Sequence, residues 1–211
     1  MLYPINLCLT GRGCTVVGGG AVALRKVRRL LAAGATVTVA APAVCEELAT
    51  LIAAGQVRFF DMAAGLPDFC GSRLVICAAA DTVVNAQAAA TARAAGALVN
   101  MAAPPLELGD FELPAAEAEG DILLTVSTGG RSPELARRLR ERLLNVAARY
   151  SEWLEVLAPY REGLKRKLTA PRERENFWRQ VLDDRLLDLV EQGNFDEAEE
   201  LIIHALDSIG S

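Results

Sequence analysis

The sequence predicts an α/β protein that begins with a parallel, doubly wound sheet. Between residues 14 and 101, short β-branched segments alternate with segments of helical periodicity, which is the pattern of consecutive β-α units. Three glycines, Gly18-Gly19-Gly20, separate the first predicted strand from the first predicted helix. After Pro104-Pro105 the alternation stops, and the rest of the chain is mainly helical in pattern.

The expected elements follow in order. Predicted strands of the sheet are 14–17, 36–40, 57–60, 74–78 and 98–101, and the helices between them are 21–33, 45–54 and 83–95. Beyond the prolines we expect strands over 110–114 and 122–126, then a basic helix that starts near Ser132-Pro133. From Tyr150 onward, Pro159, Pro171 and Gly193-Asn194 separate roughly three helices.

Composition limits the class of protein. Hydrophobic residues make up 52% of the 211 residues, which is ample for buried cores. The formal net charge of −5 gives no general attraction to nucleic acid or anionic membranes, and no segment reaches the roughly 18 apolar residues of a membrane span. Five cysteines without CxxC spacing indicate reduced thiols that pack in the core. We expect a cytoplasmic protein with neither a nucleic acid nor a membrane partner.

The glycine turn fits the dinucleotide-binding pattern G-x-G-x-x-A. Gly18 allows a sharp turn, a side chain at Gly20 would block a pyrophosphate, and Ala23 lets the helix approach the strand. Free N–H groups and the positive end of the helix attract the phosphate charge. The alternative is a turn of the same fold that binds no nucleotide. We expect a nicotinamide cofactor at Gly18, Gly19, Gly20, Ala21 and Val22.

The ends of the second and fourth predicted strands bear on the choice of cofactor. The second ends in Ala41-Pro42 and lacks the acidic residue that usually accepts the ribose hydroxyls. No Arg or Lys follows at once to bind a 2′-phosphate, so NAD is the simpler choice, with contacts at Ala41 and Pro42. At the end of the fourth strand, the small residue Ala79 either supports the nicotinamide ribose or serves close packing only.

These patterns predict three domains. Residues 1–112 form a Rossmann-like NAD-binding domain, 113–149 a small α+β module, and 150–211 a helical C-terminal domain. With two strands and one long helix, the middle module is too small to bury both of its faces alone. We therefore expect it to be a dimerisation module in a homodimer.

Further motifs accompany the glycine turn. They are Tyr3-Pro4, Arg25-Lys26, Val99-Asn100, and Ser127-Thr128-Gly129-Gly130-Arg131-Ser132-Pro133 followed by Leu135-Ala136-Arg137. With them, residues 1–145 resemble the bifunctional precorrin-2 dehydrogenase and sirohydrochlorin ferrochelatase family of siroheme synthesis, which forms the N-terminal module of siroheme synthase. The resemblance implies NAD-dependent oxidation of precorrin-2 to sirohydrochlorin, with Asn100 among the cofactor contacts. It also implies a homodimer whose second module exchanges strands and helices between subunits.

The implied substrate suits the basic helix. Precorrin-2 is a tetrapyrrole with eight carboxylates, so an acidic protein needs local positive charge and amide donors to bind it. The loop at the helix start supplies hydroxyl and N–H groups, and the helix supplies arginines. A solvated basic face is the alternative. The expected substrate contacts are Ser127, Thr128, Gly129, Arg131 and Arg137.

The chain departs from the family at one position. The family usually carries an aspartate shortly after the strand that ends in Val-Asn, but residues 99–105 contain no carboxylate, and the expected position falls at Ala103 or Pro104. The nearest carboxylates, Glu107 and Asp110, could enter the site through a rearranged loop, and their alternative role is solvation or turn capping. Our working hypothesis for the catalytic base is Asp110. Metal insertion needs a carboxylate or imidazole base, and the single histidine, His204, lies in the last predicted helix. We expect no metal site and little or no ferrochelatase activity.

Two classes of function stay open. One is an NAD-dependent precorrin-2 dehydrogenase, and the other is a non-catalytic tetrapyrrole- or nucleotide-binding protein with the same fold. Turnover of precorrin-2 with NAD distinguishes them. A nucleotide-gated regulator would share the Rossmann half, but it does not explain the loop over 127–133 or the arginine-rich helix.

Overall fold

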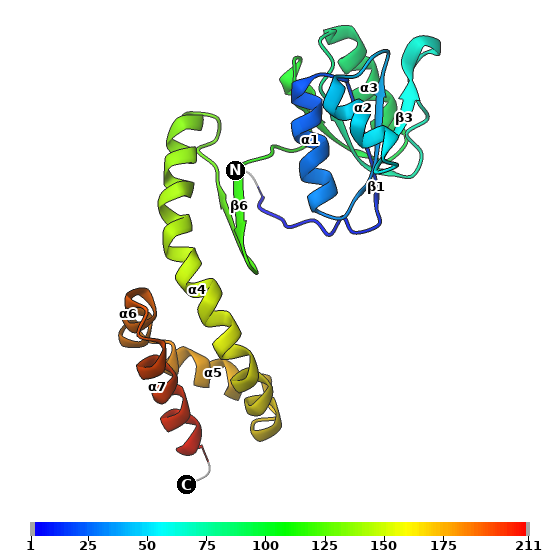
Figure 1. Ribbon diagram of the computed structural model, residues 1–211. Helices are drawn as coiled ribbons and strands as arrows, with labels where there is room; N and C mark the ends of the chain where they lie inside the picture. Colours follow the sequence, from blue (N-terminus) through cyan, green and yellow to red (C-terminus); the bar gives the residue numbers. More distant parts are fainter. Residues whose placement is uncertain (1–2, 210–211) are drawn as a thin grey trace. The chain divides into compact units, whose positions relative to one another are not determined.

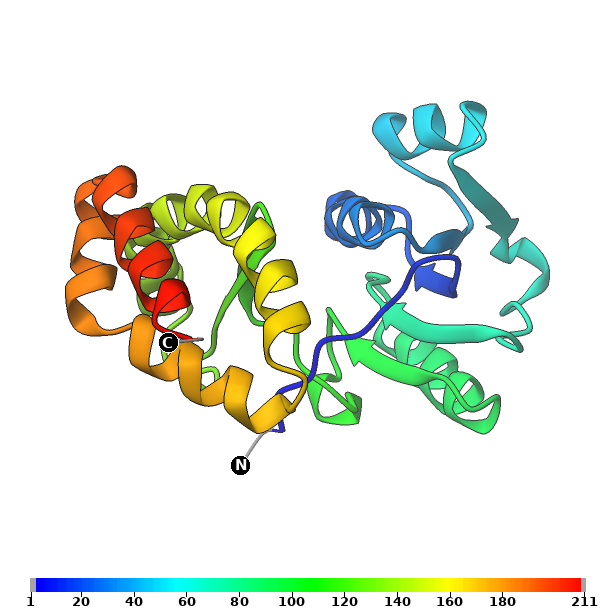
Figure 2. The ribbon, with the colours of Figure 1, turned by 90° about the horizontal axis from the view of Figure 1, so that it is seen from below.

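A computed structural model describes residues 3–209. The chain divides into two compact units, Met1–Leu113 and Pro114–Ser211. Figures 1 and 2 show the helices and strands of each unit from two directions. In the described part of the chain, no helix is both long enough and apolar enough to cross a membrane.

Five parallel strands form the sheet of the first unit, in the order β3-β2-β1-β4-β5. They are β1 (Gly13–Val17), β2 (Thr36–Ala41), β3 (Val57–Asp61), β4 (Ser72–Cys77) and β5 (Leu98–Met101). Val17 at the end of β1 lies in register with Ala40 of β2 and Cys77 of β4. The carboxyl ends of the central strands therefore meet at one edge, where the strand order reverses and where open α/β sheets bind their ligands.

Helices cover both faces of this sheet. α1 (Ala21–Ala32) and α2 (Glu46–Ala53) pack on one face, in a core that contains Val27, Leu48 and Ile76. α3 (Thr82–Ala94) packs on the other face, where its alanines contact strand residues such as Val75 and Val99. Two short 3-10 helices, η1 (Met62–Ala64) and η2 (Leu106–Leu108), lie in the loops after β3 and β5. The parallel, doubly wound sheet predicted from the sequence is confirmed.

The second unit is built along one long helix, α4 (Pro133–Lys167). An antiparallel hairpin of β6 (Ala115–Glu119) and β7 (Ile122–Val126) lies beside the first half of α4 (Figure 1). α5 (Pro171–Val181), α6 (Asp184–Gln192) and α7 (Phe195–Asp207) pack around the second half. Their shared core contains Trp153, Leu157, Leu186, Val190, Ala198 and Ile202.

The predicted strand over 110–114 is wrong, because the strand lies at Ala115–Glu119 instead. The backbone N–H of Asp110 donates to the carbonyl of Val99 at 2.8 Å, and the Phe111 carbonyl accepts from the Asn100 side chain at 2.9 Å. These groups are tied to β5 and are not available for a hairpin. Pro114 has no N–H to offer a strand partner. The hairpin begins directly after it.

The predicted helix break at Pro159 is also wrong, since α4 continues through it. An internal proline removes one helical hydrogen bond. Here buried side chains on both sides of it, Trp153, Leu157 and Leu164, hold the helix in place by packing. The predicted domain boundary between residues 149 and 150 lies inside the same helix. Division of the second unit into two domains stays a prediction.

Candidate dinucleotide-binding site

Two glycines of the turn between β1 and α1 are required by the protein's own backbone. Gly18 has a φ of +124°, and a Cβ atom there would lie 2.5 Å from the carbonyl oxygen of Ala78. A Cβ at Gly19 would overlap the carbonyl oxygen of Ala43. The Gly18 N–H donates to the Ala40 carbonyl at 2.8 Å. The turn is therefore held tightly between the ends of β2 and β4.

Gly20 is free of such constraints. Its φ is −92°, and a Cβ there would meet no atom within 4 Å. Gly20 is the N-cap of α1, no side chain caps this helix, and its first turn has no acidic residue. The N–H groups of that turn have no acceptor within the helix. A pyrophosphate at this helix end would use the open space and the N–H donors, so the residues present fit a dinucleotide.

The other predicted cofactor contacts on this edge lie at strand ends. Ala41 is buried at the end of β2, and Pro42 next to it is exposed. Ala79, two residues after β4, is half-buried. Asp61 at the end of β3 lies in register with Ala41, and its Oδ1 accepts a hydrogen bond from Ala63 N at 2.9 Å. The sequence motif did not predict this carboxylate, because the motif places the acidic residue at the end of β2 and Asp61 ends β3.

Asn100 lies within β5 and is 5% exposed. Its Nδ2 donates to the Phe111 carbonyl at 2.9 Å, while its Oδ1 has no partner among the described residues. The side chain thus holds the chain after β5 and leaves one acceptor free. A contact between Asn100 and the cofactor stays a prediction.

Asp110 lies beside the first half of β5. Its Oδ1 pairs with Arg93 Nε at 2.7 Å, and its Oδ2 accepts from Val99 N at 2.8 Å. Arg93 also donates to the Leu108 carbonyl. Because Arg93 is in the last turn of α3, this ion pair lies near the amino end of β5. Both carboxylate oxygens are engaged away from the carboxyl edge, which favours the structural alternative for Asp110.

The predicted substrate loop lies in the second unit and is stabilised internally. The Thr128 hydroxyl donates to the Ser132 carbonyl and accepts from Ser132 N, both at 3.1 Å. Ser127 Oγ accepts from Gly129 N at 3.2 Å, and Ser132 Oγ caps α4 through Leu135 N. The hydroxyl groups that sequence analysis assigned to substrate therefore shape the loop itself.

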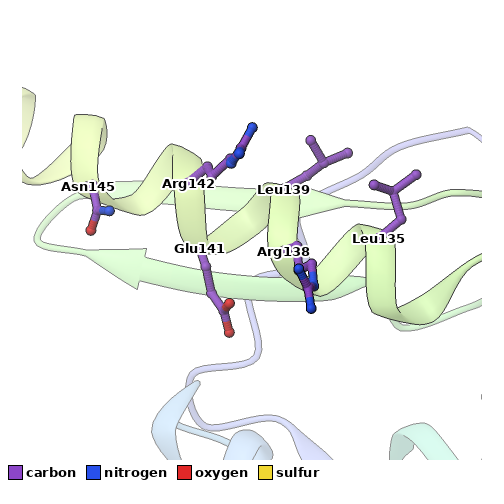
Figure 3. A pocket seen from close by; sticks show the side chains of 6 residues that line it. All are labelled: Leu135, Arg138, Leu139, Glu141, Arg142 and Asn145. Atoms are coloured by element: carbon purple, nitrogen blue, oxygen red, sulfur yellow. The ribbon is translucent and has the colours of Figure 1, made fainter.

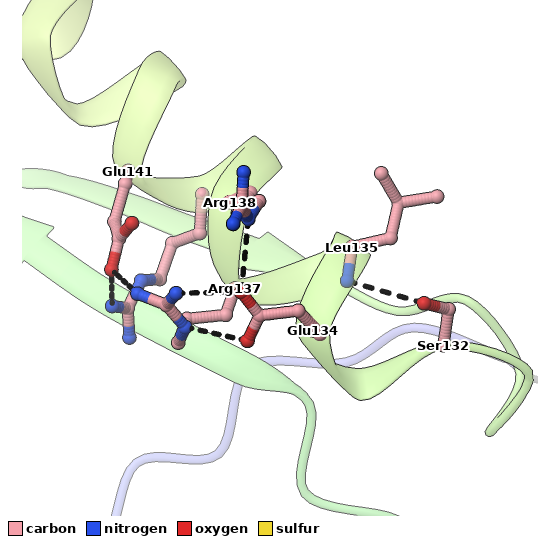
Figure 4. A network of polar contacts seen from close by, with 7 residues as sticks. Ser132, Glu134, Leu135, Arg137, Arg138 and Glu141 are labelled. Carbon is pink, nitrogen blue, oxygen red and sulfur yellow. Dashed lines mark hydrogen bonds and ion pairs between the residues drawn. The ribbon is translucent and has the colours of Figure 1, made fainter.

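Arg137 and Arg138 in the first turns of α4 are paired with carboxylates (Figure 4). Arg137 Nη2 lies 2.7 Å from Glu134 Oε1 and Arg137 also pairs with Glu141, while Arg138 Nε lies 2.9 Å from Glu134. Hydrogen bonds from Arg137 and then Arg138 lower the pKa of Glu134 to about 2. Arg131 is exposed and has no ion pair among the described residues. Of the two predicted arginines, Arg131 is thus the one whose charge is uncompensated.

The outward face of α4 carries an open hollow (Figure 3). Leu135 and Leu139 line it together with Arg138, Glu141, Arg142 and Asn145. Leu135, Leu139, Leu143 and Val146 are 39–50% exposed and recur at helical spacing. This apolar stripe lies on a helix that is otherwise highly charged, which is typical of a surface that meets another protein.

The sheet topology, the glycine turn and the uncapped helix end together define a Rossmann-type dinucleotide-binding protein. Comparison with known proteins agrees. The family model described as "Putative NAD(P)-binding" matches residues 5–115, and the model of the sirohaem synthase dimerisation region matches residues 149–206. The second match falls on the helices rather than on the hairpin.

Individual relatives narrow the class. The siroheme synthases of Methylococcus capsulatus and Nitrosococcus oceani are 38% and 37% identical to the chain over 206 and 205 residues. These matches cover 97% of this chain but only 43% and 44% of the relatives, so the chain spans less than half of their length. A solved structure of SirC, precorrin-2 dehydrogenase, is 31% identical with a TM-score of 0.69, covering 94% of this chain and 99% of that one. The chain belongs to the precorrin-2 dehydrogenase family, and siroheme synthases contain a region that is similar to it.

Proposed function

We propose that this chain is an NAD-dependent dehydrogenase that oxidises precorrin-2 to sirohydrochlorin in siroheme synthesis. The observation that carries the proposal is Gly20, a glycine that the protein's own packing does not require but that a bound pyrophosphate does. The similarity to SirC along nearly the whole chain supports the choice of substrate.

NAD rather than NADP suits the end of β2. Residues 41–45 contain no Arg or Lys to bind a 2′-phosphate, and Glu46 and Glu47 follow directly. Asp61 adds a further carboxylate beside Ala41. Three negative charges near the adenosine end favour a free ribose hydroxyl over a phosphate.

The chain's own residues bind and orient in this reaction. The cofactor supplies the hydride acceptor. The N–H groups at the start of α1 would hold the pyrophosphate, and the loops after β4 and β5 would border the nicotinamide half. The oxidation releases one hydride to the cofactor and one proton. With no carboxylate in 99–105 and Asp110 engaged by Arg93, we propose that water takes this proton.

Arg131 and the amides around Gly129 are the proposed contacts for the substrate carboxylates. Arg131 is exposed and has no ion pair within residues 3–209, whereas Arg137 would first have to release Glu134 and Glu141. The apolar stripe from Leu135 to Val146 is the proposed contact surface of a homodimer. It lies on the same helix that enters the matched dimerisation region at residue 149.

Turnover tests the proposal. Purified protein incubated with precorrin-2 and NAD should produce NADH together with the absorption spectrum of sirohydrochlorin. NAD binding without NADH above a blank would instead support the non-catalytic binding protein.

Action in the cytoplasm stays a prediction, which the five free cysteines support.

A further inference from the structure

One buried side chain on α3 connects two loops of the sheet edge. Asn85 is fully buried, and its Oδ1 accepts from Ala79 N at 3.0 Å. Its Nδ2 donates to the Ala79 carbonyl at 3.0 Å and to the Pro104 carbonyl at 2.9 Å. A single carboxamide thus supplies one acceptor and two donors to backbone groups that are 25 residues apart in the chain.

Both loops lie at the carboxyl ends of neighbouring strands. Ala79 follows β4 and Pro104 follows β5, whose last residues, Cys77 and Met101, are in register. The loop after β4 also contacts the glycine turn, because a Cβ at Gly18 would lie 2.5 Å from the Ala78 carbonyl oxygen. Asn85 therefore fixes the β4 loop, which borders the glycine turn, relative to the β5 loop.

The start of α3 does not depend on Asn85. Asp81 is the N-cap of this helix, and its Oδ1 accepts from Val83 N at 2.7 Å. The rest of the buried face of α3 is alanine, which needs no polar partner. Burial of a carboxamide among alanines is costly unless its hydrogen bonds are made, so the two loops are what this residue serves.

We propose that Asn85 is a positioning residue for the nicotinamide half of the cofactor, which it serves by holding the loops at Ala79 and Pro104 at a fixed spacing. The inference rests on the proposed function. A pyrophosphate bound at the glycine turn would place the nicotinamide half toward the ends of β4 and β5. Because Asn85 bonds both backbone groups of Ala79, a nicotinamide ribose at this position would meet a loop whose backbone is already fixed.

The test is Asn85→Asp, which keeps the size and the acceptor but loses both donors. Calorimetric titration compares NAD with ADP, which carries a pyrophosphate but no nicotinamide. We expect the variant to bind NAD about tenfold more weakly and ADP as the wild type does, since the two hydrogen bonds that Asn85 Nδ2 donates are lost at one end of the site only. With precorrin-2, kcat should also fall.

Thr15→Val is the matched control. Thr15 is buried on β1, and its hydroxyl bonds to Ser72 Oγ at 2.8 Å, at the start of β4 and away from the carboxyl edge. Loss of this bond should lower the melting temperature but leave the affinities for NAD and ADP unchanged. If Asn85→Asp does not fold, Asn85→Ser is measured by the same criteria.

Two results would overturn the proposal. Either NAD affinity stays at the wild-type value in a folded variant, or NAD and ADP weaken together as in a general loss of structure. A wild-type protein that binds ADP but neither binds NAD nor oxidises precorrin-2 would refute the proposed function instead, before any variant is compared.

Discussion

At the scale of single residues, the three glycines of the turn serve different purposes. Gly18 and Gly19 are required by the carbonyl oxygens of Ala78 and Ala43, whereas Gly20 has open space around it. The sequence motif predicted the turn, but it could not separate these roles, because they depend on loops that come from β2 and β4. Substitution at Gly20 therefore tests ligand binding with little effect on folding.

The first prediction is that Gly20→Asp weakens NAD binding at least about 100-fold, because its carboxylate occupies the phosphate position and repels it. Isothermal titration measures the affinity, and circular dichroism checks the fold. Gly163→Asp is the control. Gly163 is exposed on α4, and a Cβ there, as at Gly20, would meet no atom within 4 Å. Equal NAD affinity in both folded variants would refute the proposed site.

The second prediction concerns Glu134, whose pKa is about 2 because Arg137 and Arg138 donate hydrogen bonds to it. The folded pKa lies below the usual value of 4.5. Any stabilisation of the folded state by the Glu134 carboxylate is thus fully present above pH 4.5 and is lost as the pH falls through about 2. Carboxyl NMR titration should give the low pKa in the wild type and a value near 4.5 in the Arg137→Ala, Arg138→Ala double variant. An unshifted wild-type pKa would mean that the ion pairs do not form in solution.

At the scale of elements, the strands and helices of the first unit could be predicted because each has a local signal. β6 could not, because Ala115–Glu119 consists of Ala and Glu, which are rare in strands. It is a strand only because Ile122–Val126 pairs with it and α4 covers it. The helix break predicted at Pro159 was wrong because packing of the side chains around this proline outweighs its local preference to end a helix.

At the candidate site, too, some contacts could be predicted from the sequence and others could not. The glutamates that pair with the α4 arginines stand at i+3 and i+4 spacing, so Glu134 and Glu141 could have been read from the sequence. Asn85 also left a signal, as the polar member of a buried stripe shared with Ala88, Ala89 and Ala92. The partners of Asn85 could not be predicted, because Pro104 lies far from it in the sequence and comes close only when β4 and β5 pair.

The third prediction tests the alanine face of α3. Ala89 is fully buried against the sheet, whereas Ala90 next to it is exposed. Ala89→Leu should destabilise the first unit by about 1–3 kcal/mol, because a larger side chain pushes the helix away from the strands. Ala90→Leu should leave stability nearly unchanged. Urea denaturation of both variants measures the difference, and equal midpoints would show that α3 does not pack closely.

At the scale of the whole molecule, the packing of a single chain does not explain why the apolar stripe from Leu135 to Val146 on α4 is exposed. The fourth prediction is that the protein is a homodimer and that Leu139→Arg shifts it to monomer, since a charge cannot be buried unpaired in an apolar interface. Sedimentation velocity gives the oligomeric state. Phe59→Arg, at an exposed apolar residue of β3, should remain dimeric. A monomeric wild type at micromolar concentration would refute this prediction.

The last prediction concerns the two reactions of the family. Hydride departure is positioned by the cofactor, so a missing carboxylate base should slow dehydrogenation by about 10²- to 10⁴-fold at most, and water recovers part of this. Metal insertion removes two pyrrole protons and has no such substitute, so iron or cobalt should enter sirohydrochlorin no faster than without protein. Ala103→Asp should then raise the dehydrogenase rate or create chelatase activity.

Asp110→Asn completes this test. Loss of the charge weakens the pair with Arg93 and should destabilise the first unit, but the dehydrogenase rate of the folded variant should hold if Asp110 is structural. A loss of rate without a loss of stability would return the role of base to Asp110. Efficient metal insertion by the wild type, unchanged in Asp110→Asn, would mean that the base is neither Asp110 nor a residue of 99–105, which contain no carboxylate.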